Sequence, residues 1–207
     1  MGRVVIGIAG APGSGKSTVA GALAEALDGA TLVRMDSYER MTRQDIDAVA
    51  AWAARGGGYD ELPVPLLPEH LGELKAGRAV RDPATGQVLQ PTPHLLLETQ
   101  FGRAHRASGA HIDWLVWLDA PLDVALARTL RRLAKEALAA PSPQLRGRME
   151  WLHGYLANYL QVVQPLLRRQ REQVMPGADL VVAADQEPGA IVRQVLAALG
   201  RRGGEPA

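Results

Sequence analysis

Residues 4–17 read VVIGIAGAPGSGKS, and this stretch decides the fold. Residues 4–9 form a short apolar run, which is typical of a buried strand. Residues 10–17 then fill all four fixed positions of the Walker A pattern, and a helix is predicted over residues 18–27. A strand, a glycine-rich turn and a helix in this order aim several backbone N–H groups and the positive end of the helix dipole at one point. The sequence therefore predicts a polyphosphate-binding loop in an α/β domain.

The side chains in this loop fit a nucleotide with its metal ion. Lys16 supplies a mobile positive charge for the β- and γ-phosphates, and the Ser17 hydroxyl is placed to ligate Mg²⁺. A chance match in a tight turn is the alternative, and the flanking strand and helix argue against it. ATP and Mg²⁺ are the predicted cofactors, and the predicted nucleotide-binding residues are Gly10, Ala11, Pro12, Gly13, Ser14, Gly15, Lys16, Ser17 and Thr18.

Composition limits the partners of the chain. Its 207 residues favour one domain over residues 1–199, with a lid at about residues 132–150 and a flexible tail over residues 200–207. A formal net charge of +1 gives no global field that attracts nucleic acid or an anionic membrane. The absence of cysteine removes disulfides, thiolate metal sites and cysteine nucleophiles. With no signal-peptide pattern and no apolar segment of roughly 20 residues, we expect a cytoplasmic protein.

Apolar runs and helical patterns alternate along the rest of the chain. Strands are predicted at residues 30–35, 94–98, 114–119 and 179–183, and helices at residues 42–55, 69–76, 122–139, 149–174 and 188–199. A triple glycine at residues 56–58 ends the first of these helices, a turn or hairpin is expected at residues 81–87, and a loop containing Pro141 and Pro143 precedes Arg146. This alternation predicts a three-layer α/β fold with a parallel sheet.

Asp36 directly follows the apolar run at residues 30–35. In an open parallel sheet, ligand groups gather at the carboxyl ends of the strands, so we expect Asp36 beside the phosphate loop. Phosphoryl transfer needs in-line placement, charge neutralisation and a carboxylate that receives the proton of the attacking hydroxyl. Asp36 can be that carboxylate, and its alternative role is to cap the helix that follows.

Two carboxylates compete for the Mg²⁺. Glu98 and Asp119 each end an apolar run, so both are expected at the same edge of the sheet. Mg²⁺ prefers hard oxygen ligands and keeps several waters, which either carboxylate would satisfy. Strand-end placement alone does not separate the two.

Nearly the whole chain resembles the uridine kinase and phosphoribulokinase family of P-loop small-molecule kinases. The resemblance is carried, in order and spacing, by residues 10–17, Asp36-Ser37-Tyr38, Tyr59-Asp60, Leu97-Glu98, Leu118-Asp119-Ala120-Pro121 with Arg128 and Arg132, Arg146-Gly147-Arg148, and residues 178–182. Glu39 departs from the pattern, because a second aromatic residue usually stands there. The resemblance implies a nucleoside-kinase-like P-loop fold with a helical lid.

The resemblance also implies roles for the carboxylates. It makes Asp36 the catalytic base, favours Glu98 for the Mg²⁺ and gives Asp119 a mainly structural role. The family aspartate that matches Asp60 accepts hydrogen bonds from sugar hydroxyls, for which a carboxylate is suited by its several lone pairs. An ordinary solvated loop is the alternative for Asp60.

Several arginines lie on the predicted helix at residues 122–139 and in the lid. Basic residues on a helix usually form a solvated face, which is the alternative to a role at the phosphates. In the family, such arginines close over ATP. Arg132 and Arg148 are therefore expected at the transferring phosphoryl group, with Arg128 and Arg146 behind them. By the same resemblance, adenine is expected near the loop at residues 184–188.

Few aromatic residues are available to contact the acceptor. Tyr38 and Tyr59 are candidate contacts, and Arg81 is a third, although an arginine in a turn is usually surface charge. Tyr155 and Tyr159 are further aromatic candidates. Their segment, residues 151–160, has helical spacing and is interpreted as core or as a dimer contact.

We therefore expect an ATP-dependent kinase that phosphorylates a primary hydroxyl of a nucleoside such as uridine or cytidine, or of a small sugar-like molecule. A sugar, a sugar phosphate, glycerate or pantothenate is the alternative acceptor, and a nucleotide-binding module without phosphotransfer is the alternative class. A GTPase-like switch is disfavoured because the chain lacks an Asn-Lys-x-Asp element for guanine. A small-molecule partner is expected, without nucleic acid or membrane, and a homo-oligomer is left open.

Overall fold

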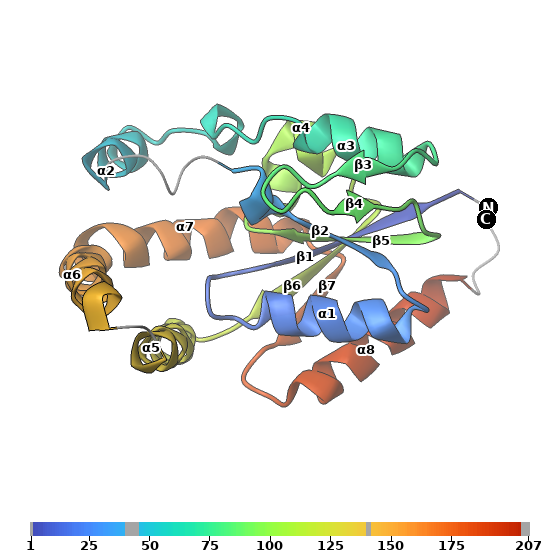
Figure 1. Ribbon diagram of the computed structural model, residues 1–207. Coiled ribbons are helices and arrows are strands. Elements are labelled where there is room, and N and C mark those ends of the chain that lie inside the picture. The colour runs from blue at the N-terminus through green and yellow to red at the C-terminus, as the bar shows by residue number, and fades with distance from the viewer. Residues whose placement is uncertain (1, 40–45, 140–141, 204–207) are drawn as a thin grey trace.

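The computed structural model describes residues 2–39, 46–139 and 142–203. Figure 1 shows a central sheet with helices on both faces. The five strands of this sheet are all parallel and lie in the order β2 (Thr31–Arg34), β5 (His94–Thr99), β1 (Val4–Gly10), β6 (Trp114–Asp119) and β7 (Leu180–Ala183). The predicted three-layer parallel α/β fold is confirmed.

The helices and short elements complete the three layers. Their bounds are α1 (Lys16–Ala26), α2 (Ile46–Ala54), α3 (Leu67–Lys75), α4 (Arg106–Gly109), α5 (Leu122–Leu138), α6 (Ser142–Asn158), α7 (Gln164–Val174) and α8 (Pro188–Gly203), with 3₁₀ turns at Met35–Ser37, Tyr59–Glu61, Gly102–Ala104 and Met175–Gly177. The strands β3 (Val80–Arg81) and β4 (Val88–Leu89) form the expected antiparallel hairpin. None of the helices in the described ranges combines the length and the apolar character that crossing a bilayer requires.

Alternate residues of the central strand β1 enter two separate cores. Ile6 and Ile8 are fully buried in the core under α1 and α8, which lie below the sheet in Figure 1. Val5 and Ala9 belong to the opposite core, which includes buried residues of α3 and α7. Successive side chains of a strand point to opposite faces, so an uninterrupted apolar run is what a strand covered on both faces requires. The carboxyl end of β1 is thereby fixed in the middle of the sheet, where the phosphate loop begins.

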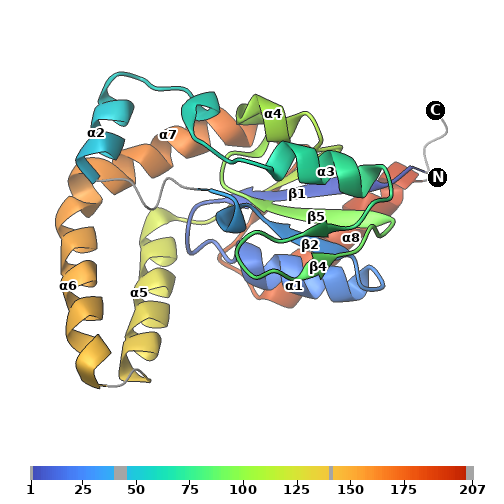
Figure 2. The same cartoon turned by 45° about the horizontal axis from the view of Figure 1, so that its top comes forward.

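The helices α5 and α6 form a hairpin that extends away from the sheet (Figure 2). A π-helical turn, Tyr159–Val163, joins α6 to α7. Such turns inside longer helices are frequent at functional sites. At its other end α7 buries Val174 in the core above the sheet, so one arm of the hairpin is anchored directly to the body of the protein.

The predicted start of a helix at residue 149, after a loop that precedes Arg146, is wrong. The helix α6 begins at Ser142, so Arg146, Gly147 and Arg148 are helical, and Pro143 lies in the first turn. A proline is tolerated there because the N–H groups of a first turn have no partner within the helix. Pro141 lies outside the described residues.

The predicted end of the last helix at residue 199 is also wrong, because α8 continues to Gly203. A glycine inside a helix costs only about 1 kcal/mol relative to alanine, so Gly200 weakens the helix without ending it. The first part of the expected tail is therefore helical. Residues 204–207 of that tail, and residues 42–45 of the first predicted helix after β2, lie outside the described residues.

Candidate active site

The phosphate loop joins β1 to α1 through backbone that only glycine adopts easily. Gly10, Gly13 and Gly15 have φ angles of 154°, 82° and 96°. A Cβ on Gly13 would lie 2.1 Å from the Ala125 carbonyl oxygen, so the loop passes too close to α5 for any side chain. Among the residues that the structure describes, no side chain caps the start of α1, and the buried Ser14 hydroxyl has no hydrogen-bond partner. These free donors fit a polyphosphate.

Lys16 lies folded over the loop. Its Nζ atom donates hydrogen bonds to the carbonyl oxygens of Gly10 at 2.9 Å and Ala11 at 3.1 Å. Burial lowers the pKa of Lys16, while the charges of Glu98 and Asp36 act in the opposite direction. The two carboxylates that the sequence singled out are thus near enough to act electrostatically on this one amine.

Glu98, at the end of β5, lies against the start of α1. The Ser17 hydroxyl donates to Glu98 Oε1 at 2.6 Å. Glu98 is only 8% exposed, and its Oε2 atom has no hydrogen-bond partner among the described residues, with Arg34 Nε 3.8 Å away. A buried carboxylate oxygen that lacks a donor, beside a serine hydroxyl and a phosphate loop, is the donor chemistry that Mg²⁺ prefers. The residues present therefore fit the metal ion.

Asp119, at the end of the neighbouring strand β6, is engaged elsewhere. It accepts two hydrogen bonds from the Arg171 guanidinium of α7, both at 2.8 Å, and a longer one from the Trp117 indole. The hydrogen bond from Arg171 holds the pKa of Asp119 below its usual value. The geometry thus gives the two candidate carboxylates different surroundings, with only Glu98 next to Ser17.

Asp36 is exposed in the 3₁₀ turn that follows β2, and Gln100 Nε2 donates to its Oδ1 at 3.2 Å. The next residue anchors this turn, because Ser37 hydrogen-bonds to the buried carboxylate of Asp82. Burial by itself would raise the pKa of Asp82, but hydrogen bonds from Thr85, Ser37 and Ala84 outweigh it and lower that pKa. The turn therefore presents Asp36 outward from a fixed base.

Tyr38 points into the protein. It is 2% exposed, and its hydroxyl lies 3.1 Å from His70 Nδ1 of α3. Burial, together with the nearby charge of Asp82, raises the pKa of Tyr38 to about 12. Tyr38 therefore anchors the Asp36 turn, and it is not among the residues that line either of the two cavities described below.

A cavity of about 560 Å³ begins beside the phosphate loop and continues between α2, α6 and α7. Its wall includes Pro12 of the loop and Gln100, whose side chain contacts Asp36. The volume is within the range of small-molecule sites. The other described lining residues are mostly aromatic or aliphatic: Val49, Trp52, Tyr59, Leu62, Phe101, Trp151, Gly154, Tyr155, Asn158, Val162, Val163, Leu166, Leu167 and Gln170.

Five aromatic residues of the described ranges contribute to this wall. Tyr59 stacks on Phe101 with centroids 5.0 Å apart, and Trp151 stacks on Tyr155 at 5.4 Å. Trp151 is 57% exposed, so the interpretation of its segment as core is wrong at that position. Tyr159, in contrast, is buried, and its hydroxyl lies 3.4 Å from the Leu122 carbonyl oxygen.

Arg169 of α7 contacts both the glycine segment at residues 56–58 and two aromatic residues of the cavity wall. Its guanidinium donates to the carbonyl oxygens of Gly56 at 3.1 Å and Gly57 at 2.6 Å. The same group lies 5.3 Å from the ring centroid of Trp52 and 6.0 Å from that of Tyr59. The triple-glycine break is therefore held against α7, with the rings of Trp52 before it and Tyr59 after it lying 6.1 Å apart between their centroids.

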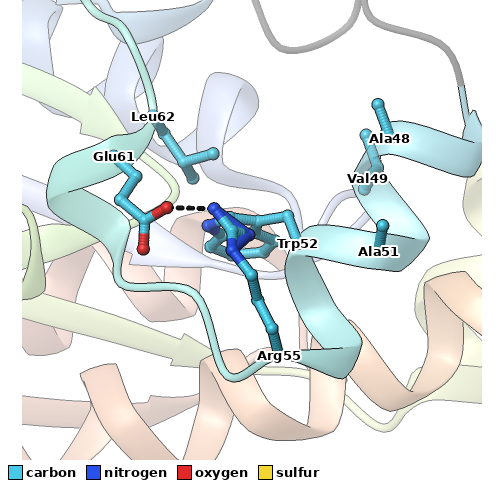
Figure 3. A pocket seen from close by; sticks show the side chains of 7 residues that line it. All are labelled: Ala48, Val49, Ala51, Trp52, Arg55, Glu61 and Leu62. Atoms are coloured by element: carbon cyan, nitrogen blue, oxygen red, sulfur yellow. Dashed lines mark hydrogen bonds and ion pairs between the residues drawn. The ribbon is translucent and has the colours of Figure 1, made fainter.

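A second, smaller cavity of about 420 Å³ lies between α2 and the turn Tyr59–Glu61 (Figure 3). Arg55 and Glu61 form an ion pair at its edge, and Trp52 contributes to the walls of both cavities. No residue of the phosphate loop lines it, so we do not assign the acceptor to it.

Asp60 and Arg81 each contact a partner outside the larger cavity. The Asp60 carboxylate accepts from the Arg106 backbone N–H at 2.7 Å and from its side chain, and these hydrogen bonds lower the pKa of Asp60. The Arg81 guanidinium donates to the Gly86 carbonyl oxygen at 3.0 Å, which closes the β3–β4 hairpin. Neither residue is among those that line the cavity.

The four candidate arginines lie on the helical hairpin. Arg128 donates to the carbonyl oxygen of Ala184 at 2.7 Å, in the loop where adenine is expected. Arg132 pairs with Glu136 at 3.0 Å and Arg146 with Glu150 at 2.8 Å, both on the helix surface, while Arg148 is exposed on α6. Exposed pairs of this kind contribute less than about 1 kcal/mol, so they release their arginines easily.

Curated relatives identify the family of the chain. A uridine kinase from Shewanella pealeana is 30% identical over 198 residues, which cover 86% of this chain and 87% of the relative. The chain belongs to the uridine kinase family. A uridine kinase from Halobacterium salinarum is 26% identical over 191 residues, covering 86% of this chain and 78% of the relative. No protein-family model matches the chain.

Solved structures support the same fold. A sugar kinase from Janibacter sp. superposes with a TM-score of 0.55 at 18% identity, covering 96% of this chain and 95% of the other. Shikimate kinase from Aquifex aeolicus has a TM-score of 0.51 at 16% identity, covering 98% and 100%. Together with its membership of the uridine kinase family, this fold makes the chain an ATP-dependent phosphotransferase, and the predicted family and enzyme class are confirmed.

Sequence reasoning missed several residues that line the cavity of this uridine kinase family member. Trp52, Phe101 and Gln170 were not among the candidates, and Trp151 was taken for core or a dimer contact. Trp52 follows a run of small residues, and Gln170 stands in a strongly polar helix. A signal existed only for Trp151 and Tyr155, whose spacing of four places them on one face of a helix.

Proposed function

We propose that this chain transfers the γ-phosphoryl group of ATP to the primary hydroxyl of a nucleoside, with uridine and cytidine as the leading acceptors. The observation that carries this proposal is the aromatic cavity that begins at Pro12 of the phosphate loop and passes Gln100, the partner of Asp36. Aromatic side chains stack well on planar rings, which suits a nucleobase better than a free sugar. The names of the relatives agree with this choice.

The chain's own residues would act as follows. Lys16 and the N–H groups of the loop hold the β- and γ-phosphates. The acceptor oxygen bonds to the γ-phosphorus as the bond to the β,γ-bridging oxygen breaks, ADP leaves, and Asp36 receives the hydroxyl proton. Mg²⁺, held by Ser17 and Glu98, neutralises phosphate charge when it is bound.

The helical hairpin of α5 and α6 is proposed as the lid of a single kinase domain. Arg132 and Arg148 would stabilise the charge on the transferring phosphoryl group, and Arg128 and Arg146 would assist them. Both surface ion pairs of these helices are weak enough to exchange a carboxylate for a phosphate. Closure of such a lid would exclude water, so that the γ-phosphoryl group reaches the acceptor instead of a solvent molecule.

Sugar phosphates, glycerate and pantothenate are weaker candidates. Each carries an anionic group, whereas the described residues that line the cavity include no lysine or arginine. A buried anion without a partner is strongly disfavoured. Nucleosides are neutral, which fits such a wall. A cytoplasmic location, where ATP and free nucleosides are available, belongs to the same proposal.

The test is ADP release from Mg²⁺-ATP with uridine, cytidine, other nucleosides, ribose, ribulose 5-phosphate, glycerate and pantothenate. We expect turnover with a pyrimidine nucleoside and none with 5′-deoxyuridine, which lacks the reacting hydroxyl. Asp36→Asn should lower kcat by about 10² to 10⁴-fold while ATP still binds, since general-base catalysis is of that size. Asp28→Asn, an exposed change beyond the far end of α1, is the matched control. Turnover only with an anionic acceptor, or with none, would contradict the proposal.

A further inference from the structure

Gln100 lies just beyond the end of β5, beside the turn that carries Asp36. The parallel strands β2 and β5 pair Arg34 with Glu98. Asp36 and Gln100 each stand two residues further on, so they leave the same edge of the sheet together. Gln100 Nε2 donates to Asp36 Oδ1 at 3.2 Å, a contact that follows from the register of the sheet.

The backbone around Gln100 is fixed by buried side chains. Thr99, which is 1% exposed, accepts at its Oγ1 atom from the N–H groups of Phe101 at 3.1 Å and Gly102 at 3.2 Å. The buried Gln170 side chain donates to the Gln100 carbonyl oxygen at 2.5 Å. Asp36, in contrast, is exposed. Gln100 is therefore anchored well enough to restrain the carboxylate that it contacts.

The orientation of a catalytic base decides how well it works. A general base must lie within hydrogen-bond reach of the proton that it receives. An exposed aspartate rotates about its side-chain bonds, and a misplacement of about 1 Å can cost about 100-fold in rate. A carboxylate has about four lone-pair sites, and the contact with Gln100 uses one of them on Oδ1. The contact thus restricts the rotation and leaves acceptor sites for the hydroxyl proton.

We infer that Gln100 is a positioning residue that holds the Asp36 carboxylate in the orientation in which it receives the proton of the acceptor hydroxyl. This inference rests on the proposed function and adds to it a residue that acts through Asp36. Loss of the Gln100 N–H group should lower kcat about 10-fold, the size expected for a hydrogen bond to a charged group. The KM for ATP should stay unchanged.

The experiment is a double-mutant cycle of Gln100→Met and Asp36→Asn, with Mg²⁺-ATP and uridine as substrates. Methionine has a similar length and no N–H group. Gln100→Met should lower kcat about 10-fold when Asp36 is present, and less than about twofold in the Asp36→Asn background, because the base that it positions is then absent. Gln173→Met, an exposed change on α7, is the matched control and should keep kcat within about twofold.

Gln100→Glu separates the hydrogen bond from packing in the cavity wall. Glutamate keeps the shape of the side chain but replaces its donor by a carboxylate oxygen, which repels Asp36. We expect kcat to fall at least as far as in Gln100→Met. An unchanged kcat in Gln100→Glu would show that only the shape of the side chain matters, which would overturn the inference.

Two results of the cycle would also overturn it. If Gln100→Met lowers kcat by the same factor in both backgrounds, the residue acts through the wall and not through Asp36. If Gln100→Met keeps kcat within about twofold in the presence of Asp36, the carboxylate needs no such support. If Asp36→Asn itself keeps kcat, or if no nucleoside is phosphorylated, the proposed function fails first and the inference falls with it, which separates the two failures.

Discussion

The phosphate loop and the aromatic cavity adjoin each other, yet they are built by different means. The loop is one continuous stretch, residues 10–17, and its function depends on backbone N–H groups and on glycine conformations. The cavity is built mainly from side chains of α2, of the segment after β5, and of α6 and α7, which are spread over residues 49–170 of the chain. A backbone site tolerates few changes and binds one chemistry, whereas a side-chain site is easily remodelled and decides which acceptor is used.

The largest effect is expected from Gly13→Ala, which should disrupt the conformation of the phosphate loop. At this position φ is 82°, and the new Cβ would lie 2.1 Å from the Ala125 carbonyl oxygen and 2.6 Å from Thr129 Oγ1. We expect ATP binding to be lost and the free energy of unfolding to fall by about 3 kcal/mol. Urea unfolding and ATP titration measure both.

Gly15→Ala is the matched control for that change. Its φ is also positive, at 96°, but a Cβ there meets nothing within 4 Å. Gly15→Ala should therefore lower the free energy of unfolding only by the backbone strain at positive φ, about 1 kcal/mol. Equal destabilisation by the two substitutions would mean that strain, and not the close approach of α5, makes Gly13 necessary.

On the hairpin, Arg132→Gln should lower kcat while leaving the free energy of unfolding almost unchanged. The Arg132–Glu136 pair is exposed, with side chains 63% and 45% accessible, so unfolding should change by less than about 0.5 kcal/mol. If Arg132 stabilises the transferring phosphoryl group, kcat should fall by about 100-fold. Arg131→Gln, one position away on the same exposed surface, should leave kcat within about twofold, and an equal loss in both variants would contradict a specific role.

Trp151→Ala tests the cavity without disturbing the core. The side chain is 57% exposed, so little stability should be lost, but its ring stacks on Tyr155 and lines the cavity proposed for the acceptor. We expect the KM for the acceptor to rise about 10-fold at an unchanged KM for ATP. Leu160→Ala is the control, because Leu160 is 71% exposed and does not line the cavity. A rise in the KM for ATP would show that the two regions are not separable in this way.

The smallest effect is expected at Asp119, the carboxylate that faces Arg171. Its pKa is lower in the folded than in the unfolded chain, so its stabilising contribution is present above about pH 4 and is lost as the pH falls through the folded pKa. Because Arg171 is half exposed, the contribution at pH 7 is at most about 1 kcal/mol. Urea unfolding of Asp119→Asn from pH 7 to pH 3 should show a deficit that disappears in acid.

Glu98→Gln tests whether the metal ion is held at the end of β5 or at the end of β6. Glu98 contacts Ser17, so its neutral variant should lower kcat strongly and raise the Mg²⁺ concentration needed for half-maximal rate. Asp119→Asn should keep kcat within about twofold. The reverse result would transfer the metal site to β6.

The sequence was informative where function follows from local backbone geometry. The Walker A pattern predicts the loop, and strand-end reasoning places Asp36 and Glu98 close enough to Lys16 to influence its pKa. It failed where function depends on which surfaces meet. The spacing of Trp151 and Tyr155 correctly predicts a shared helix face, but periodicity does not reveal whether that face meets core, another chain or a cavity.

Gln170 illustrates the same limit. It lies in the run RRQREQ, residues 168–173, whose polarity predicts a solvated surface. The structure buries this one amide because α7 turns it toward the Gln100 backbone, a contact between residues 70 positions apart. Such a partner cannot be read from local composition.

Pro12 belongs to both regions, since it stands inside the phosphate loop and also lines the aromatic cavity. Two ligands that contact the same residue are thermodynamically linked when one of them changes how that residue meets the other. If ATP changes the affinity for the acceptor by some factor, the acceptor must change the affinity for ATP by the same factor. The short stretch of backbone at Pro12 is therefore where such a coupling between the acceptor and the nucleotide would act.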